Sequence, residues 1–191
     1  MKEQLLAQVY QHPQLSASDL NKIIAAHQKL YFTKGDFILK EGQVANNYII
    51  IQQGLMRSFV YDYNGDDTTT NFFCEHEIVI EVASLFQRTP SKEYIQALTD
   101  GVGYLIDFAT FQDLFHSIDN FREWGRGWLS NSLFEFKQRS VSFIKDSATD
   151  RYLTLLKQKP KIIQQAPLKH IASFLGVTDT SLSRIRKSIH S

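Results

Sequence analysis

The stretch that decides the fold is APLKHIASFLGVTDTSLSRIRKSI, residues 166–189 of a 191-residue chain. Its apolar residues recur at helical spacing on both sides of Gly176, which predicts two short helices joined by a tight turn. Glycine can adopt the positive φ that this turn requires. Leu182 and Ile185 would then face inward, and the small side chain of Ala172 would let the second helix approach closely. This pattern is typical of a helix-turn-helix.

The second of these helices would present polar and basic side chains outward. Such a helix reads base edges in the DNA major groove, where Arg184 could donate two hydrogen bonds to guanine. Other basic and hydroxyl side chains would contact phosphates. The candidate DNA-binding residues are Lys169, Asp179, Thr180, Ser181, Ser183, Arg184, Arg186 and Lys187. The alternatives are an ordinary helical hairpin and a helix-turn-helix that makes only protein contacts.

The distribution of charge favours a nucleic-acid partner more than the total charge does. Residues 145–191 contain nine Lys and Arg against three acidic residues, whereas the whole chain has a net charge of only +1. A basic segment on an acidic body suits contact with a polyanion. The alternative is a solvated basic surface without a partner.

Upstream, between about residues 31 and 107, the pattern changes to short runs rich in β-branched and aromatic residues. Turn signals such as Lys34-Gly35-Asp36 and Asn64-Gly65 separate these runs. Several short strands at even spacing predict a sandwich or jelly roll. Asn64-Gly65 predicts a hairpin, because both residues tolerate positive φ. Residues 1–30 and 108–115 favour flanking helices.

A long helix is expected at about residues 118–145. Five of its residues are spaced 4, 3, 4 and 3 apart, which resembles a short heptad seam. The seam could pack on the chain's own sheet or pair with a second copy. We expect a homodimer, because two-fold pairs are the commonest assemblies. The candidate dimerisation residues are Leu129, Leu133, Phe136, Ser140 and Phe143.

With these features the chain resembles the Crp/Fnr family of regulators, in particular the variety common in Bacteroidetes-type bacteria. The similarity covers nearly the whole chain. It rests on Gly35-Asp36-Phe-Ile-Leu-Lys-Glu-Gly42, Tyr48-Ile-Ile-Ile-Gln-Gln-Gly54, Met56-Arg57, Asn64-Gly65-Asp66, Asp150-Arg151-Tyr-Leu-Thr-Leu-Leu156 and the helix-turn-helix. Since the sequence ends at Ser191, the full β-hairpin wing that many relatives carry is not expected.

The resemblance implies an α+β protein in three parts. Residues 1–117 would form a cyclic-nucleotide-binding-like β-roll or jelly-roll sensor domain with flanking helices. Residues 118–145 would form a long connecting dimerisation helix, and residues 146–191 an all-α helix-turn-helix domain that binds DNA. The expected function is sequence-specific transcription regulation, with double-stranded DNA as partner and RNA polymerase as a further candidate. The operator and the sign of regulation stay open.

The resemblance also locates a candidate effector pocket. In cyclic-nucleotide binders of the family, a Gly-Glu step and an arginine hold the ribose and the phosphate. Glu81 matches the glutamate, but Ile80 replaces the glycine and Ser91 replaces the arginine. A branched side chain blocks close backbone approach, and a buried anion without a partner is costly. The candidate pocket residues are Ile80, Glu81, Val82, Ala83, Ser84, Ser91 and Lys92.

Cyclic AMP and cyclic GMP are therefore disfavoured as effectors, although a regulator that responds to them is the alternative. Lys92 or Arg88 would have to supply the missing positive charge. We expect the pocket to bind another small molecule or none.

Other chemistry has little support in the sequence. Cys74 is the only cysteine, too few for the about four ligands of an iron–sulfur cluster or for an internal disulfide, and it points to the cytoplasm. A cupin-like metal enzyme would need Glu75-His76-Glu77 to converge, which strand alternation opposes. No apolar run reaches the length of a membrane span, and no signal peptide is visible. We expect no catalytic residue, metal or cofactor.

Overall fold

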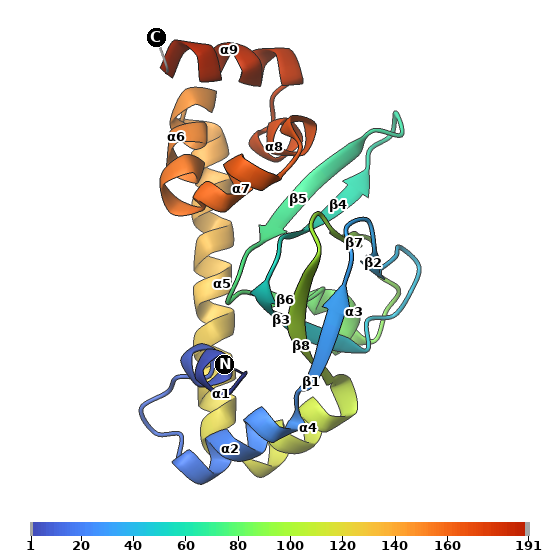
Figure 1. Ribbon diagram of the computed structural model, residues 1–191, viewed down its shortest axis with the longest axis vertical. Coiled ribbons are helices and arrows are strands. Elements are labelled where there is room, and N and C mark those ends of the chain that lie inside the picture. The colour runs from blue at the N-terminus through green and yellow to red at the C-terminus, as the bar shows by residue number, and fades with distance from the viewer. Residues whose placement is uncertain (1, 190–191) are drawn as a thin grey trace.

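The computed structural model describes residues 2–189 and has a β-roll, a long helix and a C-terminal group of helices (Figure 1). Residues 1, 190 and 191, at the ends of the first and third expected parts, lie outside the described residues. The elements are α1 (Lys2–Val9), α2 (Ala17–Ala26), β1 (Gln28–Phe32), β2 (Phe37–Leu39), β3 (Asn47–Gln53), β4 (Met56–Tyr61), β5 (Asp67–Phe73), β6 (Ile78–Val79), α3 (Val82–Gln87), β7 (Tyr94–Ala97), β8 (Gly101–Asp107), α4 (Phe108–Ser117), α5 (Asp119–Lys145), α6 (Ala148–Gln158), α7 (Pro160–Gln165), α8 (Leu168–Leu175) and α9 (Asp179–Ile189).

The β-roll consists of two antiparallel sheets with the strand orders β1-β8-β3-β6 and β2-β7-β4-β5. The central residues of strand β3 are apolar, and Ile49, Ile50 and Ile51 are fully buried in the core. At the start of β8 the backbone of Gly101 lies so close to β3 that a Cβ would be 2.2 Å from the Gln53 carbonyl oxygen. Only glycine fits there, which lets the two strands pair up to their ends.

The hairpin of β4 and β5 extends from the β-roll toward the C-terminal helices (Figure 1). Its turn is organised by Asp62, whose Oδ1 accepts hydrogen bonds from the backbone N–H groups of Asn64 and Asp66. Gly65 has a φ of +86°, the positive value expected for this turn. The hairpin predicted from Asn64-Gly65 is therefore present, and it positions a strand edge beside α8.

The long helix α5 begins against the β-roll and its flanking helices and ends against the C-terminal helices. Phe121 and Trp124 are buried near its start, and the indole N–H of Trp124 donates to the Val9 carbonyl at 2.9 Å. Gly125 lies against the ring of Phe115, where a Cβ would meet a ring carbon at 2.6 Å. Farther along, most side chains are exposed.

The C-terminal helices enclose an apolar core of their own. Leu155, Ile171, Leu175 and Leu182 are buried there, and Leu55, Phe72 and Leu98 of the β-roll join the same cluster. Gly176 ends α8 with a φ of +68°, as the sequence predicted. Helix α7, which begins at Pro160, was not among the helices expected from the sequence. Proline is favoured at the first position of a helix, which suits this start.

The α+β fold class, with a β-roll, a long connecting helix and C-terminal helices, is confirmed. None of the helices in residues 2–189 is long and apolar enough to cross a membrane.

Candidate nucleic-acid interface and sensor pocket

Helix α9 is held by its inward face and leaves the other face exposed. Leu182 is fully buried, and Ile185 packs partly against the same core. The hydroxyl of Thr178 caps the helix by accepting the backbone N–H of Ser181 at 3.2 Å, and it donates to the Ser181 hydroxyl at 3.0 Å. Asp179 in the first turn complements the helix dipole. The cap thus uses the Ser181 hydroxyl that was predicted to contact DNA.

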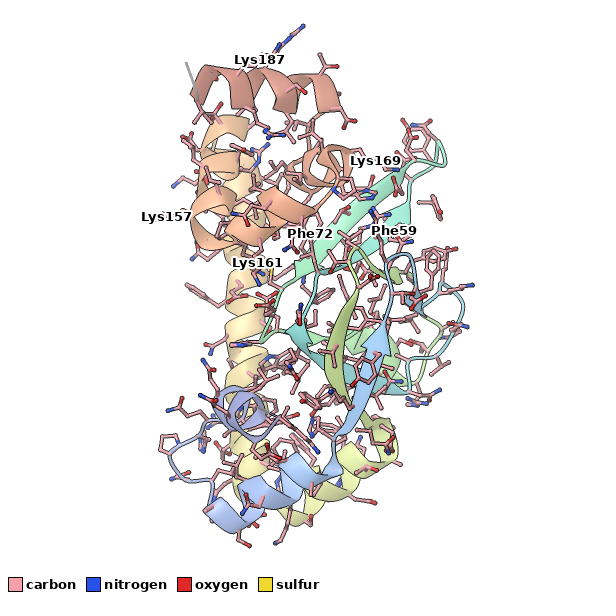
Figure 2. The ribbon with its side chains drawn as sticks, viewed as in Figure 1. Phe59, Phe72, Lys157, Lys161, Lys169 and Lys187 are labelled. Atoms are coloured by element: carbon pink, nitrogen blue, oxygen red, sulfur yellow. The ribbon has the colours of Figure 1, made fainter. Side chains whose placement is uncertain are left out.

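The predicted DNA-contact residues fall in two places. Asp179, Thr180, Arg184 and Lys187 are exposed on α9, and Ser181, Ser183 and Arg186 are half-buried on the same helix. Lys187 lies at the far end of the molecule from the sheets, whereas Lys169 lies beside the β4–β5 hairpin (Figure 2). The Lys169 ammonium is 3.7 Å from the carboxylate of Asp67. The structure therefore groups seven of the eight residues and separates Lys169 from them.

A buried polar cluster joins α8 to the hairpin. The guanidinium of Arg57 donates from Nη1 to Nδ1 of His170 at 2.7 Å and from Nη2 to Oδ2 of Asp67 at 2.5 Å. It also donates to Thr69 and Gln96. The side chains of Arg57 and His170 are only 3% and 7% exposed, so these contacts are shielded from water. Sequence patterns did not identify this cluster, because its members are 113 residues apart.

The ionisation of this cluster follows from its burial. Burial and the adjacent Arg57 guanidinium lower the pKa of His170 to about 4, although Asp67 opposes the shift. A neutral imidazole has the free lone pair that Nδ1 needs to accept from Arg57. Burial alone would raise the pKa of Asp67, but the hydrogen bond and charge of Arg57 hold it below its usual range. Arg57 and Asp67 are thus an ion pair with a neutral histidine against it.

Arg139 makes a second connection, from α5 to both β5 and α8. Its guanidinium donates to the Thr70 carbonyl and, at 3.2 Å, to the Phe174 carbonyl, and it lies 3.8 Å above the Phe174 ring. Burial lowers the pKa of Arg139 to about 10, while the charge of Glu93 opposes the shift. Arg139 therefore remains cationic at neutral pH and caps the C-terminus of α8.

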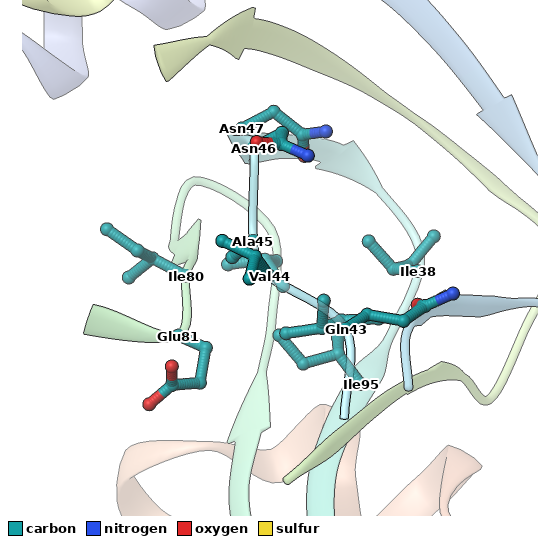
Figure 3. Close-up of a pocket in the computed structure, with 11 residues that line it drawn as sticks. Ile38, Gln43, Val44, Ala45, Asn46, Asn47, Ile80, Glu81 and Ile95 are labelled. Carbon is teal, nitrogen blue, oxygen red and sulfur yellow. The ribbon is translucent and has the colours of Figure 1, made fainter. Parts of the chain in front are cut away.

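A cavity of about 450 Å³ opens between the two sheets of the β-roll. Figure 3 shows Ile80 and Glu81 on one side of it and Ile38 and Ile95 on the other, with the Glu81 carboxylate at the edge. The lining residues are Ile38, Leu39, Gln43, Val44, Ala45, Asn46, Asn47, Val79, Ile80, Glu81 and Ile95. Of the seven predicted pocket residues, Ile80 and Glu81 line this cavity.

Two of the other predicted pocket residues are engaged in local structure. Ser84 is buried, and its hydroxyl accepts the Ala45 N–H at 2.8 Å and donates to the Thr89 carbonyl at 2.6 Å. Ser91 is buried too, and its hydroxyl donates to the Glu93 carbonyl at 2.8 Å. Val82, Ala83 and Lys92 are exposed.

The surroundings of the cavity offer little to a phosphate. The Glu81 carboxylate caps α3 by accepting the Ser84 N–H. Arg88, the cation nearest in sequence, donates to the Ala45 carbonyl at 2.6 Å and to the Asn46 side chain at 2.5 Å. Burial raises the pKa of Glu93, and the charge of Glu81 adds to the shift. The only ionisable side chain in the lining is a carboxylate.

The middle of α5 carries an exposed apolar face. Leu129, Leu133 and Phe136 are 50%, 66% and 68% exposed, and Ser140 is half-buried. Ile144, at 86%, continues this face near the end of the helix, whereas Phe134, at 63%, points to another side; neither was identified by the sequence analysis. They fall outside the spacing of the predicted seam, each one residue after one of its members.

Phe143, the last residue of the predicted seam, has a second environment. It is 41% exposed, and a Cβ on Gly176 would lie 2.9 Å from its ring. Arg139 and Arg151 approach the ring at 5.5 and 4.9 Å. Arg151 also donates from Nη2 to the Leu175 carbonyl at 2.9 Å. The end of α5 is therefore fixed to the turn between α8 and α9.

Metal-type residues are dispersed in the described part of the chain. Residues 2–189 contain no group of three or more His, Cys, Asp and Glu side chains that could hold a metal ion. Glu75 and Glu77 instead pair with Lys161 and Lys159 at 2.5 and 2.6 Å. Burial raises the pKa of the Cys74 thiol to about 11, which makes it a poor nucleophile.

Comparison with known proteins gives matches to one domain family and to many structures. Residues 29–117 match the cyclic nucleotide-binding domain family. CLP from Xanthomonas campestris, described as a c-di-GMP responsive global regulator, is 17% identical with a TM-score of 0.70, and the alignment covers 92% of each chain. FixK2 from Bradyrhizobium japonicum is 15% identical with a TM-score of 0.74, over 86% of this chain and 84% of that one.

The Thermus thermophilus catabolite activator protein is 16% identical with a TM-score of 0.58, over 93% of this chain and 85% of that one. No curated protein sequence matches the chain. At these identities the structural matches establish the fold.

Proposed function

Because residues 29–117 match the cyclic nucleotide-binding domain family and the fold is similar to that of Crp/Fnr-type regulators, we propose that this protein is a DNA-binding transcription regulator. In this proposal residues 1–117 are the sensor, 118–145 the dimerisation helix and 146–191 the DNA-binding domain. The protein acts as a homodimer. Regulation, not catalysis, is its activity.

The exposed face of α9 is the observation that carries this proposal. The helix is anchored by Leu182 and capped by Thr178, so its polar face is rigidly presented at one end of the molecule. Arg184 on that face matches the bidentate contact that arginine makes with guanine. The surrounding basic side chains suit phosphate contact.

The exposed apolar face of α5 supports the homodimer. Leu129, Leu133 and Phe136, which share one face of the helix, are each half exposed or more in the single chain. Exposed apolar surface of this kind marks an interaction site. Pairing of two α5 helices would cover it and place two α9 helices for adjacent half-sites of a two-fold-symmetric DNA sequence.

The proposal excludes a cyclic nucleotide as the molecule that the cavity binds. Glu81 already caps α3, Ser91 bonds its own loop, and Arg88 is tied to residues 45 and 46. A cyclic phosphate entering the cavity would meet no free cation among the lining residues. Isothermal titration with cyclic AMP and cyclic GMP should give no binding heat. Saturable micromolar binding of either would refute this part of the proposal.

Selection of duplexes from a random DNA pool tests the DNA-binding activity. The purified protein should enrich a two-fold-symmetric sequence. Arg184→Ala should weaken binding to it by about tenfold to a hundredfold, as expected for loss of one bidentate base contact. Arg126→Ala is the matched control, since Arg126 is 77% exposed on α5 and pairs with Glu123. Failure to enrich any sequence, or equal effects of both variants, would contradict the proposal.

A further inference from the structure

We propose that the β4–β5 hairpin of the sensor is a clamp that fixes the position of the α6–α9 helices through polar contacts with α8. The clamp consists of Arg57, Asp67 and Thr69 on the hairpin and of His170 and Ser173 on α8. Loss of these contacts lets α6–α9 shift on the sensor while they stay attached to α5.

The centre of the clamp is the guanidinium of Arg57, which joins three parts of the interface at once. It bonds His170 of α8 on one side and Asp67 of β5 on the other. The guanidinium also lies over the ring of Phe59, 4.0 Å from the ring centroid, in a cation–π contact. A planar, forked donor on an aromatic ring has little freedom to follow a displaced partner. The position of α8 is therefore set by Arg57.

Further polar contacts lie on both sides of this centre. The backbone N–H of Thr69 donates to the Ser173 hydroxyl at 3.1 Å, so α8 occupies part of the free edge of β5. Toward the base of the hairpin, Lys159 and Lys161 pair with Glu77 and Glu75. The lysine side chains are about a third exposed or more, so these ion pairs contribute little free energy. They help to orient α7 relative to the β-roll.

The chemistry of the clamp suits a contact that can break and re-form. Within residues 2–189, Nε of Arg57 is buried without a hydrogen-bond partner, which is costly in a permanent core. Buried ion pairs contribute little net stability but fix geometry. The apolar residues Leu55, Phe72 and Leu98 hold the helices to the sensor, and apolar contact is non-directional. The polar contacts of the clamp consequently fix one position of α6–α9 on the apolar surface formed by these residues.

The opposite side of α8 has a different attachment, which stays with the moving part. Phe143 packs on Gly176, and Arg151 bonds the Leu175 carbonyl. Both contacts involve the end of α5 or the helix that follows it. When the clamp opens, α6–α9 would therefore turn about the end of α5.

The consequence for regulation rests on the proposed function. In a homodimer, the separation of the two α9 helices must match one turn of DNA. A clamp that sets the position of α8 in each subunit also sets that separation. A change in the sensor that alters Arg57 or Asp67 would then alter the affinity for a specific duplex.

Double electron–electron resonance measures the clamp directly. Spin labels are placed at Asn64→Cys on the hairpin turn and Ser188→Cys on α9, in a Cys74→Ser background. Labelled protein is mixed with a large excess of unlabelled protein, so that distances are measured within one chain. We expect one narrow distance in this parent. Arg57→Met should add a second or broader population, with the closed-to-open ratio lowered about tenfold or more.

Arg88→Met is the matched control. Arg88 also lies over a phenylalanine of the sensor, 4.5 Å from the Phe108 ring, and bonds buried backbone, but it does not touch α8. It should leave the distance unchanged. If Arg57→Met does not fold, Ser173→Ala is the second test variant. It removes the acceptor for the Thr69 N–H and, within α8, the hydrogen bond from the Ser173 hydroxyl to the His170 carbonyl.

An unchanged narrow distance in the folded clamp variants would overturn the proposal. The distance is read without DNA, so this result is independent of duplex selection. If the clamp opens but no duplex is ever enriched, the proposed function fails and the clamp stands.

Discussion

Acidification should loosen the contact between α8 and the β-roll, because His170 must be neutral to accept the hydrogen bond from Arg57. Its pKa is lowered to about 4 in the folded protein, from an ordinary value near 6.5. Because the pKa of His170 is lower in the folded protein than in the unfolded chain, protonation favours unfolding. The folded state therefore keeps its full stability only above the unfolded pKa. This stabilisation decreases as the pH falls below about 6.5 and is lost by about pH 4.

The size of the effect follows from the shift. Each pKa unit corresponds to about 1.4 kcal/mol, so His170 should account for up to about 2 kcal/mol of lost unfolding free energy at about pH 5. His27 is a second buried histidine whose pKa is lowered to about 4, chiefly by burial, and it contributes with the same sign. The two contributions have to be separated by mutation.

Urea unfolding of the wild type and of His170→Asn at about pH 7.5 and about pH 5 separates them. Asparagine keeps an acceptor oxygen near the position of Nδ1 but does not titrate. The wild type should lose about 2 kcal/mol more than the variant between the two pH values. Equal losses in the two proteins would show that the neutral state of His170 does not matter, and the reasoning would be wrong.

Four further substitutions test other parts of the account. Gly127→Ala should raise the unfolding free energy by about 0.5–1 kcal/mol, because a Cβ at this helical position meets open space. Gly125→Ala should lower the unfolding free energy, because a Cβ there would meet the Phe115 ring. Urea unfolding of both variants checks the opposite signs. Gly176→Ala should cost at least about 1–2 kcal/mol in the same assay, since alanine is strained at positive φ. Phe136→Asp should weaken self-association by about tenfold or more in sedimentation equilibrium, and an unchanged dimer would refute the α5 interface.

Local signals in the sequence were sufficient for most of the fold. The helical spacing around Gly176 and the turn signal at Asn64-Gly65 correspond to α8, α9 and the β4–β5 hairpin. Both depend on backbone chemistry within a few residues. Helix α7 was missed because Pro160 is compatible with both the end of one helix and the start of another.

The sites could be predicted less well, because they depend on tertiary contacts. Glu81 has the right sequence position for a ribose contact, but its carboxylate caps α3. Lys169 is as basic as the α9 residues, but it lies beside Asp67. The pairing of Arg57 with His170 has no local signature in either segment. The assignments of DNA-contact, dimerisation and pocket residues remain predictions.

The measurement that tests the central claim most directly is the affinity and stoichiometry of the protein with its selected duplex. Fluorescence anisotropy and sedimentation at fixed salt should show two chains per duplex. The affinity for the selected duplex should be at least about a thousandfold higher than the affinity for a scrambled duplex of the same composition, the usual range for specific regulators. Equal affinity for both duplexes, or no binding to either at low salt, would contradict the account.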